Sequence, residues 1–461
     1  MSDPVAPRTA AIVNLGCKVN QSEMEAAARL LREGGVPLVD PDRGAELVIV
    51  NTCTVTSMAD EKSRQAVRRA RRANPDARVI VTGCSVQVDP AMYARVDPAA
   101  ILVDNDAKAA FLAELEALLA LGRDIVGSGG DLGSAASHEP LTAALPTLSG
   151  VEAASLIDGI ADDRASVERT RAFVKVQDGC QHRCAFCIVP TARGRSRSQE
   201  PQAVVEQIQA LVESGYGEVT LTGVDIGHYG WDLSPRTRLA ALVRRAAEVK
   251  GLRWLRLSSV LPAYFTPELV EAVTSARAVV PHQHLPLQSG SDRVLRLMRR
   301  PYNVRMYRTL AEKLATAIPD LGLGTDIIVG HPGESEADFE ATMSFVRELP
   351  LTYLHVFAYS DRKGTEAAGM DSHAATPVIR ERSRRLRALG IEKSLAFRQR
   401  LVGRMVDALV LEDTARGERT GLTANYVEVG FERATMLARS FARVRVTEAD
   451  SRGTRGVLEA A

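Results

Sequence analysis

The sequence lacks the features of several protein classes. No apolar run in its 461 residues approaches the roughly 18 that a membrane span needs, and Met1-Ser2-Asp3-Pro4 does not begin a secretory signal. We therefore expect a cytoplasmic protein. The net charge is only +1, so any binding of nucleic acid must come from local basic patches rather than from overall attraction. The length predicts about three domains.

Cysteine is scarce, with six residues in the whole chain. Six cysteines form a disulfide framework in short secreted chains, which this sequence does not resemble in length. Three are widely separated and three are clustered, which suggests two sets of three. The six positions are Cys17, Cys53, Cys84, Cys180, Cys184 and Cys187.

The clustered set has the spacing CxxxCxxC and follows the alternating run Phe173–Gln177, which predicts a buried strand. Three thiolates on a 4Fe–4S cluster leave one iron open for a ligand that is not protein. A zinc site without its fourth ligand and a disulfide with a spare thiol are the alternatives, but the spacing fits neither usual zinc pattern. The motif resembles that of the radical S-adenosylmethionine (SAM) enzymes, whose open iron holds the amino and carboxylate groups of SAM.

The first 120 residues alternate between strand and helix patterns, which predicts a small parallel α/β domain. Cys17, Cys53 and Cys84 each follow a predicted strand by one to three residues. Because ligand sites gather at the carboxyl ends of parallel strands, we expect a second three-thiolate cluster there. A single cysteine in such a place would be read as a small buried hydrophobe. The predicted strands are 10–15, 46–51, 78–82 and 101–103, and the helices are 21–32, 59–72 and 107–121.

The segments Leu15–Gln21, Asn51–Thr56 and Thr82–Cys84 resemble the three blocks of the methylthiotransferase N-terminal domain. The Lys-Val-Asn-Gln wording after Cys17 is similar to the branch that acts on N6-threonylcarbamoyladenosine in tRNA. The resemblance implies two 4Fe–4S clusters and SAM, with one cluster reducing SAM and the other holding the sulfur. It also implies a tRNA anticodon stem-loop as substrate and an external electron donor such as flavodoxin or ferredoxin. The sulfur donor is left unknown.

The central block, residues 165–397, carries six predicted β/α units, too few for an eight-stranded barrel. The resemblance implies an incomplete (β/α)6 radical SAM barrel, with Gly223, Gln288 and Gly330 beside the cofactor. A plain turn is the alternative for Gly223. His331 stands where the family has an aromatic residue. The strands are 173–177, 218–221, 252–257, 279–286, 323–329 and 351–357, and the helices are 204–212, 237–248, 267–276, 291–316 and 335–348.

The C-terminal piece, residues 398–461, predicts a small antiparallel β-barrel from short strands at 406–411, 426–429, 434–438 and 442–446. Gly421–Val429 resembles the TRAM domain, an OB-like RNA-binding module. The predicted fold is therefore α/β, with an N-terminal domain at 1–121, a linker at 122–164, the barrel and this last domain. Six arginines of the C-terminal piece are expected to contact phosphate: Arg404, Arg416, Arg419, Arg439, Arg443 and Arg445.

Other polar residues permit two interpretations each. The helix 59–72 carries Lys62, Arg64, Arg68, Arg69, Arg71 and Arg72, either as a tRNA-binding face or as a solvated one. Arg193, Arg195 and Arg197 alternate, so they could share a face that holds phosphate or a carboxylate, or they could belong to a solvated loop. His282 and His284 also alternate, but no third metal ligand is evident at a usable spacing. Ser291 or Asp292 is expected to cap the following helix.

The family resemblance implies a tRNA methylthiotransferase that inserts a methylthio group at C2 of N6-threonylcarbamoyladenosine next to the anticodon. Cofactors must carry such chemistry, because side-chain acid–base catalysis cannot break an aromatic C–H bond. Two alternatives remain. One is methylthiolation of isopentenyladenosine in tRNA or of a ribosomal protein. The other is an RNA-binding protein with structural metal centres and no turnover.

Overall fold

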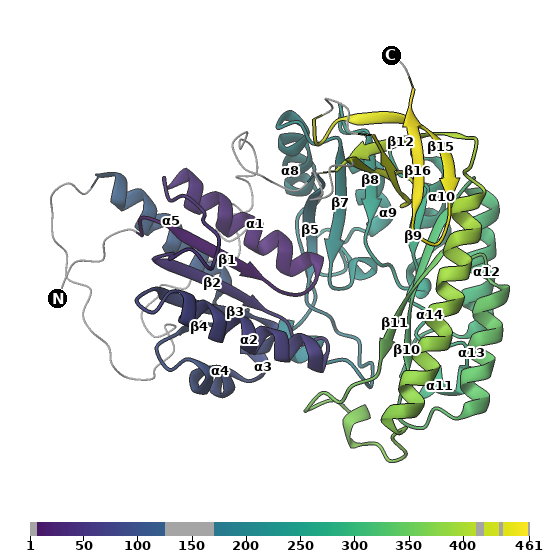
Figure 1. The fold of residues 1–461 in the computed structure, drawn as a ribbon, viewed down its shortest axis with the longest axis horizontal. Coiled ribbons are helices and arrows are strands. Elements are labelled where there is room, and N and C mark those ends of the chain that lie inside the picture. Colours follow the sequence, from purple (N-terminus) through teal and green to yellow (C-terminus); the bar gives the residue numbers. More distant parts are fainter. Residues whose placement is uncertain (1–6, 125–169, 412–418, 433–436, 460–461) are drawn as a thin grey trace. The chain divides into compact units, whose positions relative to one another are not determined.

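The computed structural model describes residues 7–124, 170–411, 419–432 and 437–459 (Figure 1). By mutual packing the chain divides into two units. Of the described residues, the first comprises 7–124, 179–181 and 188–195, and the second comprises 170–178, 182–187 and those from 196 onward. From residue 125 onward the predicted linker lies outside the described residues. None of the helices described is both long and apolar enough to cross a membrane.

The first unit contains a four-stranded sheet in which each strand pairs in parallel with its neighbour in the sequence. This confirms the predicted parallel α/β fold. The strands are β1 (Ala10–Asn14), β2 (Leu47–Thr52), β3 (Arg78–Gly83) and β4 (Ile101–Val103). The helices are α1 (Lys18–Glu33), α2 (Ser57–Ala73), α3 (Cys84–Val88), α4 (Pro90–Val96) and α5 (Lys108–Asp124), with α7 (Val189–Arg193) added from later in the chain.

Helices cover both faces of this sheet, which explains why its central strands are apolar without alternation. On one face Ile49 packs with Leu31 of α1 and Leu115 of α5. On the other face Val50 packs with Val67 of α2 and Tyr93 of α4. The two cores leave only the ends of the strands open for a functional site.

The second unit is built on six parallel strands, each followed by a helical segment. Ladders join β5, β7 and β8 and also β9, β10 and β11, and one parallel bridge between Leu255 and Val279 connects the two groups. In the part of the chain that the structure describes, no ladder joins β11 back to β5, so the ring stays open. The strands are β5 (Ala172–Asp178), β7 (Glu218–Gly223), β8 (Trp254–Leu257), β9 (His282–His284), β10 (Gly322–Val329) and β11 (Tyr353–Ala358), with the short antiparallel β6 (Arg197–Ser198) beside β5.

The helices of this unit differ from prediction at two places. The predicted helix 291–316 is two helices, because Arg299 adopts φ 55° and Pro301 cannot continue a helix. The 24-residue helix α14 was not predicted, since its buried Leu386, Leu389 and Phe397 are spread among many arginines. The helices are α8 (Pro201–Glu213), α9 (Leu239–Ala247), α10 (Pro267–Ser275), α11 (Asp292–Leu297), α12 (Val304–Ala317), α13 (Glu336–Glu348) and α14 (Thr376–Gln399), with 3-10 turns η2 (Ile226–His228), η3 (Pro262–Tyr264) and η4 (Ala367–Gly369).

The C-terminal part forms the predicted closed barrel, in the strand order β12-β13-β14-β16-β15. One pair, β14 with β16, is parallel rather than antiparallel. The predicted strand 426–429 starts later, because Tyr426 has φ 70° and turns the chain. The predicted strand 434–438 lies mostly outside the described residues, and β13 and β16 were not predicted. The strands are β12 (Met405–Val410), β13 (Arg419–Thr423), β14 (Glu428–Phe431), β15 (Phe441–Ala449) and β16 (Thr454–Leu458).

Candidate metal centres and cofactor site

Three cysteines stand at the carboxyl ends of three neighbouring strands of the first unit. Cys53 and Cys84 directly follow β2 and β3, and Cys17 lies three residues after the last residue of β1. Gly16 (φ +116°) and Gly83 (φ +104°) allow the chain segments that carry the cysteines to approach one another. A Cβ on Gly16 would lie 2.9 Å from Cys53 Cβ, closer than real carbon atoms pack.

The three thiols influence one another electrostatically. Burial, the largest cause, and the neighbouring thiols of Cys17 and Cys84 together raise the pKa of Cys53 to about 12. Three thiols at one edge of a sheet can supply the three thiolates of a 4Fe–4S cluster and leave one iron open.

The predicted shared face of Arg193, Arg195 and Arg197 is wrong. Arg195 and Arg197 are exposed, whereas Arg193 is buried and its Nε donates to Cys84 Sγ over 3.2 Å. Asn105 Nδ2 lies 3.6 Å from the same sulfur. Nitrogen donors aimed at a sulfur atom are the surroundings that a cluster-bound thiolate needs.

The CxxxCxxC motif lies in the loop after β5. The backbone N–H of Cys180 donates to Gly194 O (3.0 Å), and that of Cys187 donates to Cys184 O (3.1 Å). Arg300 Nη1 donates to Cys184 Sγ over 3.1 Å. None of the six cysteines is in a disulfide. Arg300 was missed by the sequence analysis, since nothing in its neighbourhood marks it as a partner of a cysteine 116 positions away.

Each predicted cofactor residue lies at the end of a strand of the second unit or shortly after one. Gly223 ends β7, and a Cβ there would lie 2.6 Å from Gln177 O. Gly223 is thus required for close approach of β5 rather than for positive φ. Gln288 adopts φ 70° and its N–H donates to Asp326 O over 2.8 Å. Gly330 adopts φ +83° and faces Ile379 of α14. Their assignment to the cofactor stays a prediction.

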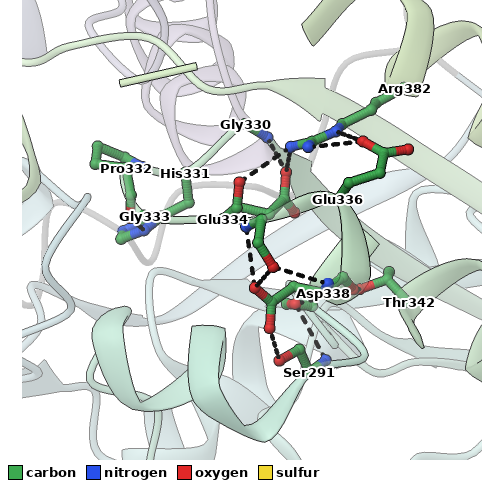
Figure 2. Close-up of polar contacts among 12 residues, drawn as sticks. Ser291, Gly330, His331, Pro332, Gly333, Glu334, Glu336, Asp338, Thr342 and Arg382 are labelled. Atoms are coloured by element: carbon green, nitrogen blue, oxygen red, sulfur yellow. Dashed lines mark hydrogen bonds and ion pairs between the residues drawn. The ribbon is translucent and has the colours of Figure 1, made fainter. Parts of the chain in front are cut away.

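The loop after β10 is fixed by a buried acid, as Figure 2 shows. Glu334 Oε2 accepts from the backbone N–H of Gly330 (2.8 Å) and from Arg382 Nη1 of α14 (2.8 Å). Arg382 also pairs with Glu336 over 2.9 Å. Ser335 and Asp338 form a reciprocal capping box at the start of α13, and Asp338 also accepts from Ser291 Oγ, the N-cap of α11. The capping role predicted for Ser291 is therefore confirmed.

Loss of Arg382 is expected to loosen this loop. Arg382→Met would leave the Glu334 carboxyl buried without its guanidinium partner, so the carboxyl would protonate or turn outward. Burial already raises the pKa of Glu334, and Arg382 opposes that rise. If Gly330 borders the cofactor, SAM affinity should fall by about tenfold, equivalent to about 1.4 kcal/mol. Calorimetric titration with SAM measures this. Arg384→Met, on an exposed position of α14, is the control and should leave affinity unchanged.

His331 is buried in this loop. Its ring contacts Phe186 and Tyr359 edge-on, with centroids 6.3 and 5.5 Å apart, and its Nδ1 lies 3.0 Å from Pro332 O. Burial lowers the pKa of His331, so the ring is neutral at pH 7. A neutral ring packed between aromatic residues occupies the space that an aromatic side chain would take.

A second polar cluster was missed by the sequence analysis. His284 Nε2 and His355 Nδ1 lie 3.3 and 3.2 Å from the same Oδ1 of Asp326, on the three adjacent strands β9, β11 and β10. Burial alone would raise the pKa of Asp326, but the two neighbouring histidine rings together lower it. Ser259 Oγ lies 2.7 Å from His284 Nδ1. No signal in the sequence marks this cluster, because it depends on the register that pairs Asp326 with His355.

This cluster lies on the side of the sheet that faces away from the helices. Leu354 packs against Gly390 of α14, and side chains alternate along a strand, so His355 points to the opposite side. Tyr353 occupies the same side as His355, with its ring over Gly324. The inner side of the open ring is therefore polar at this level.

Some of the basic residues predicted to contact tRNA form ion pairs within the protein. On α2, Arg69 pairs with Asp42 and Arg71 with Asp97 (Nε–Oδ2 2.9 Å), while Lys62, Arg68 and Arg72 are exposed. In the C-terminal barrel, Arg404 pairs with Asp320 over 2.6 Å.

Arg439 stacks on Tyr216 with its guanidinium 4.0 Å from the ring centre, and Arg443 pairs with Glu459 over 3.1 Å. Arg416 lies outside the described residues. Part of the predicted phosphate-binding set therefore serves packing within the protein.

Comparison with known proteins agrees with this geometry. Residues 174–346 match the radical SAM superfamily, and residues 9–104 match the uncharacterized protein family UPF0004. The fold is similar to that of the radical SAM methyltransferase TsrM from Kitasatospora setae, with a TM-score of 0.55 at 16% identity over 79% of this chain and 74% of that one. The second unit is thus a radical SAM domain.

Curated relatives extend over nearly the whole chain. The Bacillus subtilis threonylcarbamoyladenosine tRNA methylthiotransferase MtaB is 34% identical over 96% of this chain and 94% of its own. The Moorella thermoacetica tRNA-2-methylthio-N(6)-dimethylallyladenosine synthase is 35% identical over 97% of each. The chain belongs to the radical SAM methylthiotransferases and is an enzyme. Membership implies a 4Fe–4S cluster and SAM as cofactors.

Proposed function

We propose that this enzyme inserts a methylthio group into N6-threonylcarbamoyladenosine in the anticodon stem-loop of tRNA, and that it carries a second 4Fe–4S cluster. The observation that carries the second cluster is the set of three cysteines at equivalent strand ends, with Arg193 and Asn105 directed at Cys84 Sγ. When bound, the two clusters and SAM supply the radical and the sulfur that the side chains cannot.

The chain's own residues are proposed to bind and orient the cofactors and the modified base. Cys180, Cys184 and Cys187 would hold the SAM-binding cluster, and Arg300 holds the Cys184 sulfur in place. Gly223, Gln288 and Gly330 are proposed to border SAM. The polar inner side of the open ring, with His284, Asp326 and His355, is proposed to face the modified base.

This polar cluster favours the threonylcarbamoyl substrate over the dimethylallyl one. The threonylcarbamoyl group carries a carboxylate, a hydroxyl and a urea, all of which need hydrogen-bonding partners when they are taken out of water. The dimethylallyl group is a hydrocarbon and would gain nothing from a histidine pair. Relatives from both branches match this chain at 34% and 35% identity, so identity alone does not separate the two substrates.

Replacement of His355 tests this assignment. His355→Phe should lower kcat/KM for tRNA that bears threonylcarbamoyladenosine by about tenfold, the effect of one hydrogen bond worth about 1.4 kcal/mol. His355→Gln, which keeps a hydrogen-bonding side chain at the same place, is the matched variant and should retain most of the activity. Equal activity of the Phe variant and the wild type would argue against contact between His355 and the substrate.

The tRNA and the electron donor must reach the enzyme from solution. The exposed Lys62, Arg68 and Arg72 on α2 and the exposed Arg445 on β15 are proposed to contact tRNA phosphates. A small electron carrier such as flavodoxin or ferredoxin is proposed as the reductant.

Modification profiling tests the substrate directly. Nucleosides from tRNA of a strain that lacks this gene are compared with those of the parent strain by mass spectrometry. We expect 2-methylthio-N6-threonylcarbamoyladenosine to disappear and its unmethylthiolated precursor to accumulate. Loss of the dimethylallyl product instead would assign the enzyme to the other branch.

A further inference from the structure

Arg193 is an unusual residue for the loop in which it stands. It ends the five-residue helix α7, six residues after Cys187, yet its side chain is only 2% exposed. Its neighbours Arg195 and Arg197 in the same loop are exposed. A buried guanidinium needs partners for its charge and its N–H groups, so the partners indicate why it is buried.

Each side of the Arg193 guanidinium meets a different group of the first unit. Nη1 donates to Glu23 Oε1 (2.9 Å), Nη2 donates to Asn20 Oδ1 (2.5 Å), and Nε donates to Cys84 Sγ (3.2 Å). Asn20 in turn donates to the carbonyl oxygens of Leu15 and Thr52, beside Cys17 and Cys53. One guanidinium therefore touches a cysteine of the set and, through Asn20, the backbone next to the other two.

The charges around Arg193 are not those of a simple ion pair. Glu23 also pairs with Lys108, whose Nζ lies 2.6 Å from Oε2. Arg193, Glu23 and Lys108 all have side chains no more than 6% exposed. One carboxylate is therefore shared by two buried cations beside the cysteine thiols. Thiolates that hold a cluster supply the negative charge that such a site favours.

We propose that Arg193 is a positioning residue for the second cluster, which it serves through the Cys84 sulfur. The N–H···S hydrogen bond withdraws charge from the thiolate and stabilises the reduced cluster, since hydrogen bonds to sulfur raise cluster reduction potentials. The Asn20 and Glu23 contacts fix the guanidinium so that Nε keeps this direction. The inference rests on the proposed second cluster and adds a residue outside the three cysteines that sets its potential.

The test uses the full-length chain with Cys180→Ala/Cys184→Ala/Cys187→Ala, so that any remaining cluster is the N-terminal one. After anaerobic reconstitution, iron content, the electron paramagnetic resonance spectrum of the reduced cluster and its reduction potential are measured. Arg193→Gln and Arg193→Lys are compared in this background, with Arg195→Gln as the exposed control. Thermal unfolding of each apoprotein reports on folding separately.

Arg193→Gln is expected to shift the reduction potential to more negative values and to change the spectrum. Arg193→Lys keeps a cation for Glu23, so its iron content and melting temperature should match those of the parent, but its potential should not, because lysine lacks the fixed Nε–H. Arg195→Gln should match the parent in every measurement.

Two results would overturn the proposal. Parent-like potentials and spectra in both Arg193 variants, or full restoration of the potential by lysine, would leave Arg193 as an ordinary structural ion pair. Absence of iron in the background variant with Arg193 intact would contradict the second cluster itself, and with it this inference.

Discussion

A variant with Cys17→Ala, Cys53→Ala and Cys84→Ala is expected to lose all methylthio transfer while it still cleaves SAM. The wild type should hold about eight irons after reconstitution and the variant about four, because each set of three thiolates is proposed to hold one 4Fe–4S cluster. The remaining set, Cys180, Cys184 and Cys187, lies in the loop after β5 and is untouched. Iron analysis and chromatographic measurement of 5′-deoxyadenosine and of the methylthio nucleoside test this.

The converse variant separates the two roles. Cys180→Ala/Cys184→Ala/Cys187→Ala should retain about four irons but form no 5′-deoxyadenosine, since SAM would have no open iron to bind. If the wild type holds only about four irons, and all of them depend on Cys180, then the N-terminal cysteines serve packing alone. That outcome would contradict the two-cluster account.

The buried pair of Glu218 and Arg256 is expected to give the largest stability change. Both side chains are 0% exposed, and Arg256 Nε and Nη2 lie 2.9 and 3.2 Å from the two oxygens of Glu218. Arg256 also donates to Ala424 O (3.1 Å) and faces the ring of Tyr426, both next to the C-terminal barrel. Glu218→Ala would leave a buried guanidinium without its carboxylate, which destabilises by about 3–5 kcal/mol.

A double variant distinguishes the charge effect from packing. Glu218→Met/Arg256→Met removes both charges and keeps most of the volume, so it should be more stable than Glu218→Ala. Chemical denaturation followed by circular dichroism gives the free energies of unfolding. Arg244→Ala, an exposed arginine paired with Glu271, is the control and should change stability by less than about 1 kcal/mol. A Glu218→Ala variant as stable as this control would contradict the account of the pair.

The sequence was sufficient for the features that depend on local pattern. Apolar runs at regular intervals predicted the strands of both sheets, and the C-terminal barrel followed from short strands with polar turns. The cysteines could be placed at strand ends because β1, β2 and β3 end within three residues of them. The predicted helix 291–316 was wrong for a local reason, because the chain breaks between α11 and α12 at Arg299 and Pro301.

The residues that surround the sites could not be predicted from the sequence. Arg193 and Cys84 are 109 positions apart, and Arg300 and Cys184 are 116 apart. Arg193 therefore looked like one of three equivalent loop arginines. Asp326 and His355 meet only through the register of β10 with β11, which hydrophobic patterning alone does not fix.

Anaerobic reaction of the reconstituted enzyme with tRNA tests the central claim most directly. Two tRNA preparations, one bearing N6-threonylcarbamoyladenosine and one bearing dimethylallyladenosine, are incubated with SAM, a reductant and a sulfide source, then digested and analysed by mass spectrometry. The account predicts that the threonylcarbamoyl nucleoside gains one methylthio group in place of a hydrogen and that the dimethylallyl nucleoside stays unchanged. Methylthiolation of the dimethylallyl nucleoside alone would contradict the proposed substrate. Cleavage of SAM without a methylthio product on either tRNA would contradict the proposal that tRNA is the substrate.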